Sequence, residues 1–223
     1  MSHSTLLAVS LAFSFAAYLP YVHGIGRGEI RPTRPTWLMI LITDLLLFGF
    51  MLMEARWDWL LLGFTAGNLS VLGAMAWSDL RAARLDGIAP GARFRETALL
   101  AVLGRDAWTS KDLYSVGVAS TAVALWAISG SGVAAICFSL AGKIAASVPM
   151  WINLLRDPAR EPILPWAFWT LGGGLYVLAI PASEWSFVSL ATPVLFLILE
   201  CIVLALLMRR FADLPTTAPA HQI

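Results

Sequence analysis

The apolar positions of the chain gather into seven long runs, separated by stretches rich in charge, proline and glycine. Each run approaches the length of about 20 residues that an α-helix needs to cross the hydrocarbon core of a bilayer. The pattern predicts seven membrane-spanning helices, at residues 5–23, 36–53, 59–77, 113–130, 131–155, 163–182 and 185–208. Only a Gly-Ser-Gly sequence separates the fourth run from the fifth, so a single long tilted helix is the alternative there.

Composition supports a membrane protein. Of the 223 residues, 59% are hydrophobic and 13% are charged, against roughly half and a quarter in a soluble domain. A soluble fold of this size could not bury so much apolar surface, so the fold class expected is an all-α polytopic membrane protein. The net charge of +1 gives no field that would attract nucleic acid, and no nucleic-acid partner is expected.

The basic residues indicate an orientation. If there are seven spans, successive loops alternate sides, and one side receives only Arg56. The other side receives Arg27, Arg31, Arg34, Arg81, Arg84, Arg93, Arg95, Arg105, Lys111, Arg156, Arg160, Arg209 and Arg210. Because cytoplasmic loops carry the excess of Lys and Arg, we expect a multi-pass protein of the cell (inner) membrane, with its N-terminus outside and its C-terminus in the cytoplasm.

The first and fifth predicted spans resemble each other. The sequence AAYLP at 16–20 aligns with AASVP at 145–149 at an offset of 129, and the same offset superposes Arg27 on Arg156 and Trp37 on Trp166. Such self-similarity indicates an internal repeat. Since three spans are an odd number, the fourth span restores the direction of the chain and makes the two three-helix repeats parallel, an arrangement found in transporters.

The repeat predicts the organisation of the chain. A first three-helix repeat occupies 1–78, a linker helix 113–130 and a second three-helix repeat 131–210. The cytoplasmic loop 79–112 contains an amphipathic stretch at 92–108, which would be a helix on the membrane surface or a linker without order. The tail 211–223 is expected to be disordered.

This layout resembles the SWEET and PQ-loop superfamily, in which a proline lies toward the cytoplasmic end of the first and fifth spans. The sequence YLPY at 18–21, followed by GEIRP at 28–32 and by Thr36 and Trp37, is similar to an uncharacterised bacterial branch of PQ-loop-like proteins. The Pro-Gln dipeptide of the family is Pro-Tyr at 20–21 and Pro-Met at 149–150 here. The resemblance implies a small-solute transporter or facilitator that works by alternating access, with a sugar or another small polar solute as substrate.

Two prolines are candidate hinges. Pro20 and Pro149 each remove a backbone hydrogen-bond donor and loosen the preceding helical turn. In a transporter they would serve the inner gate, and otherwise they are static kinks.

Four polar residues lie within the predicted spans and are candidate substrate-binding residues: Asp44, Asn68, Lys143 and Glu200. An ionisable group at the bilayer centre costs about 2.5 to 3.5 kcal/mol on insertion scales, so each is a hypothesis of function by default. Two acids and one base leave one carboxylate unpaired, which could carry a proton or face a cationic substrate. The alternative is a buried Lys-Glu clamp that joins two helices.

Asn68 and Glu200 are expected to face each other. The offset of 129 places position 68 at Leu197, one helical turn from Glu200. The resemblance implies a ligand-binding role for Asn68, because SWEET-like proteins carry a pair of asparagines in the third and seventh spans. Glu200 departs from that pair and points to a charged or hydrogen-bond-donating ligand. Alternatively, Asn68 only joins helices.

Most tryptophans fall near the ends of predicted spans, where an indole ring can anchor a helix at the membrane interface. Seven tryptophans lie at such positions, and most of them are expected to be anchors: Trp37, Trp57, Trp59, Trp77, Trp108, Trp166 and Trp185.

The sequence contains no recognisable catalytic constellation. Its three histidines do not form a metal set, and neither HExxH, P-loop nor GxSxG occurs. We therefore expect no enzyme activity, no cofactor and no metal. Besides the solute and the bilayer, the partner would be a second copy of the chain or another membrane protein. The alternative function is a non-transporting integral membrane subunit, receptor or assembly protein with the same fold.

Overall fold

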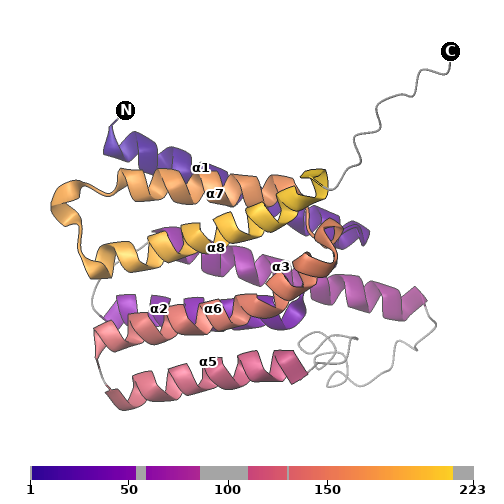
Figure 1. Ribbon diagram of the computed structural model, residues 1–223, viewed down its shortest axis with the longest axis horizontal. Coiled ribbons are helices and arrows are strands. Elements are labelled where there is room, and N and C mark those ends of the chain that lie inside the picture. The colour runs from indigo at the N-terminus through magenta and orange to yellow at the C-terminus, as the bar shows by residue number, and fades with distance from the viewer. Residues whose placement is uncertain (1, 54–58, 86–109, 130, 213–223) are drawn as a thin grey trace.

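The structure is a computed structural model, which describes residues 2–53, 59–85, 110–129 and 131–212 (Figure 1). All regular structure in these residues is helical, which confirms the predicted all-α class. The α-helices are α1 (His3–Arg27), α2 (Arg34–Met53), α3 (Trp59–Leu85), α5 (Ser110–Ser129), α6 (Gly132–Arg156), α7 (Ile163–Ala179) and α8 (Phe187–Ala212). Two short 3-10 helices, η1 (Pro158–Arg160) and η2 (Ala182–Glu184), flank α7.

Among the described residues, four helical segments are long and apolar enough to cross a membrane: His3–Arg27, Leu60–Ala82, Ile136–Arg156 and Phe187–Phe211. They lie in α1, α3, α6 and α8. The segments Val116–Ser129 and Ile163–Ala179 are shorter apolar helices. These lengths are consistent with a membrane protein, while the count of seven spans stays a prediction.

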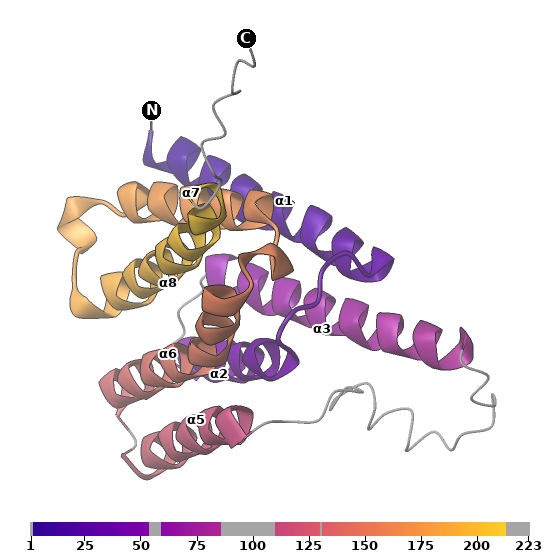
Figure 2. The ribbon, with the colours of Figure 1, turned by 45° about the vertical axis from the view of Figure 1, so that its right-hand side comes forward.

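The largest difference between the predicted runs and the helices is at the end of the third run. α3 continues to Leu85, so the first residues of the predicted loop 79–112 are helical. The alternative of one long helix at 113–155 is wrong, because α5 ends at Ser129 and α6 begins at Gly132. The Ser131 hydroxyl accepts a hydrogen bond from the Ala134 N–H at 3.4 Å and caps α6. The two helices pack side by side (Figures 1 and 2).

Successive helices run in alternating directions. α1, α3, α6 and α8 end on the side where α2, α5 and α7 begin (Figure 1). We call this side the basic end, because it carries Arg27, Arg31, Arg34, Arg81, Arg156, Arg160, Arg209 and Arg210. Arg34 forms an ion pair of 2.6 Å with Asp79 there and ties α2 to α3.

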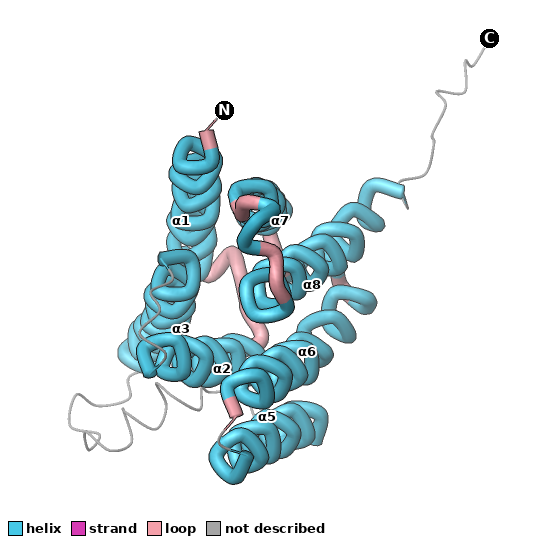
Figure 3. The backbone as a smooth tube through the Cα atoms, turned by 90° about the vertical axis from the view of Figure 1, so that its left-hand side faces the viewer, coloured by secondary structure: helices cyan, strands magenta, loops and turns pink. Residues whose placement is uncertain are grey.

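The helix contacts follow a twofold pattern. α3 packs against α1 and α2, and α8 packs against α6 and α7. Between these groups, α1 packs against α7 and α2 against α6 (Figure 3). Exchanging α1 with α6, α2 with α7 and α3 with α8 converts every one of these contacts into another. α5 lies outside the pattern and packs against α6 and α2.

Several positions that the predicted repeat pairs have similar burial in α1 and α6. Ala17 of α1 and its counterpart Ala146 of α6 are both fully buried, and Ile25 and its counterpart Leu154 are nearly so. Both helices therefore present the same face to the protein interior. The long apolar core cluster joins these faces to α3, α7 and α8.

Candidate functional site

A cavity of about 70 Å³ lies where the two groups of helices meet. Asp44, Asn68, Lys143 and Glu200 all line it, from α2, α3, α6 and α8 respectively. The structure thus brings together all four polar residues that the sequence analysis selected. The volume accommodates several water molecules or a solute of a few heavy atoms.

Asp44 is the centre of a polar network. Its side chain is fully buried, and its two carboxylate oxygens have different partners. Lys143 Nζ forms an ion pair with Oδ1, and Asn68 Nδ2 donates a hydrogen bond of 2.6 Å to Oδ2. The ion pair of Lys143 in the described residues is with Asp44 of α2, so the Lys-Glu clamp that the sequence left as an alternative is not the pair that forms there. The clamp that forms joins α2 to α6.

Asn68 also receives a hydrogen bond. The Tyr18 hydroxyl of α1 donates to Asn68 Oδ1 at 3.2 Å, so Asn68 links α1, α2 and α3. Gly67 makes this possible, because a Cβ there would lie 2.1 Å from the Tyr18 ring. Tyr18 belongs to the motif YLPY at 18–21, and its position in the sequence indicates no role in the site.

Glu200 has a different environment. Its side chain is 8% exposed, and its Oε2 atom has no hydrogen-bond partner in the described residues. Gly173 leaves room for this atom, since a Cβ at that position would lie 2.8 Å from Oε2. The ammonium of Lys143 lies 3.4 Å above the centre of the Phe196 ring, one turn from Glu200. Among the described residues, Glu200 Oε2 is therefore available to accept a hydrogen bond from a ligand.

The pattern of buried residues in α3 matches that in α8 when the residue numbers differ by 132. The counterparts that this offset pairs are all buried: Phe64 and Phe196, Asn68 and Glu200, Val71 and Val203, and Met75 and Leu207. The predicted match of Asn68 with Leu197 is therefore displaced by three residues, and Leu197 is only half-buried. Three residues are nearly one helical turn, so Leu197 and Glu200 lie on neighbouring turns along one side of α8.

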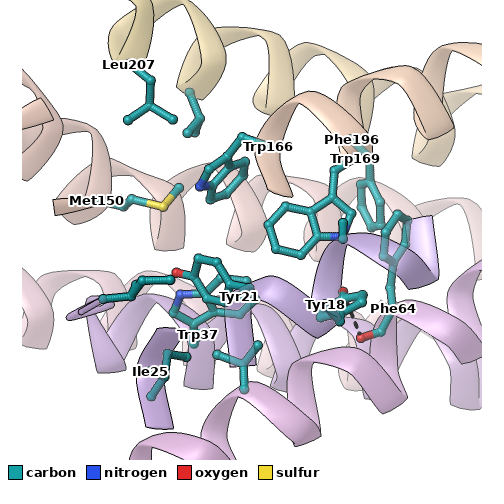
Figure 4. Packing of buried hydrophobic residues seen from close by; sticks show 14 of the residues in the cluster. Tyr18, Tyr21, Ile25, Trp37, Phe64, Met150, Trp166, Trp169, Phe196 and Leu207 are labelled. Carbon is teal, nitrogen blue, oxygen red and sulfur yellow. Dashed lines mark hydrogen bonds between the residues drawn. The ribbon is translucent and has the colours of Figure 1, made fainter. Parts of the chain in front are cut away.

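An aromatic cluster lies beside the cavity: Trp37, Trp166 and Trp169 line it, and Tyr21 packs against Trp37 and Trp169 (Figure 4). Its ring centres are 5.1 Å apart for Tyr21 and Trp37, and 5.0 Å apart for Trp166 and Trp169. Trp37 is 4% exposed and Trp166 is 6% exposed, so the prediction that they are interface anchors is wrong. Both occupy equivalent repeat positions, and the pairing of α1 with α7 and α2 with α6 turns both inward.

Pro20 and Pro149 lie inside α1 and α6, in the half of each helix nearer the basic end. Each helix continues beyond its proline, to Arg27 and Arg156 respectively. Figure 2 shows that α6 changes direction along its length, as a proline within a helix produces. A third proline, Pro193 of α8, was missed and lies one turn before Phe196 in the cavity wall.

Glu161 is a buried acid that the sequence analysis missed. It follows η1, is 3% exposed, and accepts a hydrogen bond of 3.3 Å from Trp166 Nε1. Burial raises the pKa of Glu161 to about 7, although the nearby Tyr21 and Trp166 and the charge of Arg160 act to lower it. Its position in a charged loop gave no sequence signal of burial.

Replacing Glu161 by glutamine is expected to flatten the pH dependence of stability. Folding raises the pKa of this group from 4.5 to about 7, so in that window the folded state binds the proton that the unfolded state releases. The stability of the wild-type protein therefore falls as pH rises through the window, by about 3 kcal/mol at most, and is level above it. Thermal unfolding in detergent at several pH values measures the slope.

Glu184→Gln makes the same chemical change at an exposed position of η2 and is expected to leave the wild-type slope unchanged. A Glu161→Gln variant that retains the wild-type slope would show that this carboxyl does not titrate in the window.

Some predictions lie outside the described residues. These are the surface helix at 92–108, the anchors Trp57 and Trp108, and the tail beyond residue 212. Within the described residues, no group of three His, Cys, Asp or Glu side chains could hold a metal ion. Cys137 and Cys201 are free and exposed.

No protein-family model, curated protein or solved structure matches the chain. In the part of the chain that the structure describes, the fold defines an all-helical protein with four helices long and apolar enough to span a membrane.

Proposed function

We propose that the chain is a small-solute membrane transporter or facilitator of the SWEET and PQ-loop type, which works by alternating access. The observation that carries the proposal is the convergence of Asp44, Asn68, Lys143 and Glu200 on one cavity. These residues come from four helices, and polar side chains at such depth are expensive unless they serve a solute or one another.

The arrangement of helices also supports the proposal. α1 to α3 form one parallel repeat, α6 to α8 form the other, and α5 is the linker between them. The twofold pattern of contacts and the paired burial of Asn68 and Glu200 are what such repeats require. Transporters with parallel repeats bind their solute at the repeat interface near the membrane midplane.

Each proposed residue has a role. Asn68 and Glu200 contact the solute from opposite repeats, while Lys143 and Asp44 set the charge of the site. Pro20 and Pro149 are the hinges that let the basic ends of α1 and α6 move. The aromatic cluster of Tyr21, Trp37, Trp166 and Trp169 is the part that must separate when the inner gate opens.

A second candidate function is a non-transporting membrane subunit, receptor or assembly protein. The observation that favours it is the mutual satisfaction of Tyr18, Asn68, Asp44 and Lys143. In this function the network is a clamp between helices and the cavity is never reached by water from both sides.

Thiol labelling distinguishes the two functions. Ser147 lines the cavity and is 2% exposed, and Ser147→Cys changes one atom. In a chain without Cys137 and Cys201, a membrane-impermeant thiol reagent applied from each side is expected to label position 147 from both sides. Protection from both sides would favour the structural subunit, and labelling from one side alone would contradict alternating access.

Two further single-cysteine variants calibrate the labelling. Leu45 is 48% exposed and is the neighbour of Asp44 in α2, so Leu45→Cys should face lipid and escape the reagent. Glu184→Cys lies in η2, between α7 and α8. If the N-terminus is outside, Glu184→Cys is labelled from the outside only.

A further inference from the structure

The cavity has an unbalanced charge. Its charged lining residues are the carboxylates of Asp44 and Glu200 and the ammonium of Lys143. When all three groups are ionised, the cavity carries one net negative charge, whichever of the two acids pairs with the ammonium. An uncompensated charge in an apolar interior is costly, so the site is complete only with a positive charge added.

The carboxylate oxygen that lacks a hydrogen-bond donor belongs to Glu200. Lys143 is held by Asp44 of α2, whereas Glu200 Oε2 has no hydrogen-bond donor in the described residues. Glu200 is more than nine-tenths buried and lines the cavity. A positive group in the cavity would therefore be bound from the side of α8.

Aromatic rings line the same cavity as Glu200. Tyr18, Phe64, Trp169 and Phe196 all line the cavity, and Figure 4 shows them close together. The ring centres of Phe64 and Phe196 are 5.2 Å apart, and those of Tyr18 and Trp169 are 5.0 Å apart. The faces of aromatic rings attract organic cations, and the ammonium of Lys143 already lies over Phe196.

A proton would also neutralise the site, but it needs no aromatic wall and no volume. A cavity of about 70 Å³ bounded by rings and one unpartnered carboxylate fits an ammonium or guanidinium group on a small solute. The excess negative charge would repel an anion. A neutral sugar would leave this charge uncompensated.

We propose that the cavity binds a compact organic cation, held through its ammonium or guanidinium group by Glu200 and the rings of Phe64 and Trp169. That this cation is the transported solute rests on the proposed function, whereas its binding to the cavity does not. The cavity is expected to bind small amines or guanidines and not sugars.

Binding is tested with the purified full-length protein in detergent. Guanidinium chloride and methylammonium chloride are each titrated in the millimolar range. Each replaces sodium chloride, so the chloride concentration stays constant. Tryptophan fluorescence is recorded. Since Trp37, Trp166 and Trp169 line the cavity, a saturable change is expected with at least one of the two cations. Urea, the neutral analogue of guanidinium, should give no saturable change.

Glu200→Gln keeps the shape of the side chain and removes its charge, and is expected to weaken cation binding at least about tenfold, or 1.4 kcal/mol. Glu184→Gln, the same change at an exposed site, should bind like the wild type. If Glu200→Gln does not fold, Gly173→Ala serves instead, because its Cβ would displace Glu200 Oε2 and should also weaken binding.

Three results would overturn the inference: equal binding of urea and guanidinium, no saturable response to either cation, or unchanged cation binding in Glu200→Gln. The proposed function fails separately. If Ser147→Cys is labelled from both sides but no cation binds, the transporter stands and its solute is of another class. If cations bind while Ser147→Cys is protected, the site stands and transport does not.

Discussion

Lys143→Met is expected to destabilise the protein by about 3 to 5 kcal/mol, the usual effect of removing one partner from a buried ion pair. Asp44 is fully buried and Glu200 nearly so. Without the ammonium, two carboxylates remain in one apolar cavity, and Asp44 keeps only its hydrogen bond from Asn68. The temperature of unfolding in detergent and the yield of monodisperse protein measure the loss.

The double variant Asp44→Asn with Lys143→Met is expected to recover most of that stability. An asparagine at position 44 can still accept the hydrogen bond from Asn68, and the uncompensated charge on that side of the cavity is gone. Asp44→Asn alone leaves the ammonium beside Glu200 and should be milder than Lys143→Met. If the double variant is no more stable than Lys143→Met, the ion pair is not the reason for the loss.

Gly172→Ala is expected to separate α1 from α7, at a cost of about 1 to 3 kcal/mol for an overpacked contact. A Cβ at position 172 would lie 2.5 Å from Ser14 Oγ, 3.0 Å from the Ser10 carbonyl oxygen and 3.1 Å from the Ser14 nitrogen. Two of these atoms are backbone and cannot rotate away. The hydrogen bond of 2.7 Å from Ser10 Oγ to the Gly172 carbonyl would be lost with the contact.

The same glycine run supplies the matched control. A Cβ at Gly174 would meet only Leu197 Cδ1, at 4.0 Å, so Gly174→Ala should be neutral or stabilise the helix by up to about 1 kcal/mol. Unfolding temperatures of the two variants in one detergent give the comparison. Equal effects of Gly172→Ala and Gly174→Ala would mean that the close approach of α1 and α7 does not contribute to stability.

The sequence predicted the helices well because length and polarity decide them. The predicted span 36–53 became α2 (Arg34–Met53), and the span 163–182 became α7 (Ile163–Ala179). Charged residues and prolines interrupt the apolar runs at these places, so the ends follow from local chemistry. Where a polar stretch can still be helical, as in α3 beyond residue 77, apolarity alone underestimates the helix.

The sequence also selected the residues of the candidate site, for a reason that needs no structure. An ionisable or amide side chain in an apolar run has a high cost, and Asp44, Asn68, Lys143 and Glu200 stand out for that reason alone. The repeat at an offset of 129 led to the further prediction that Asn68 and Glu200 face each other. Both inferences depend on composition and register along the chain.

The partners of these residues were decided by tertiary structure. Lys143 and Asp44 are 99 positions apart, and whether Lys143 meets Asp44 or Glu200 depends on how α2, α6 and α8 rotate about their axes. Glu161 is buried because Tyr21 and Trp166 cover it, and Trp37 and Trp166 turn inward because α1 meets α7 and α2 meets α6. Apolar pattern and charge therefore determined the helices and the polar candidates, whereas helix rotation and close packing decided which side chains meet.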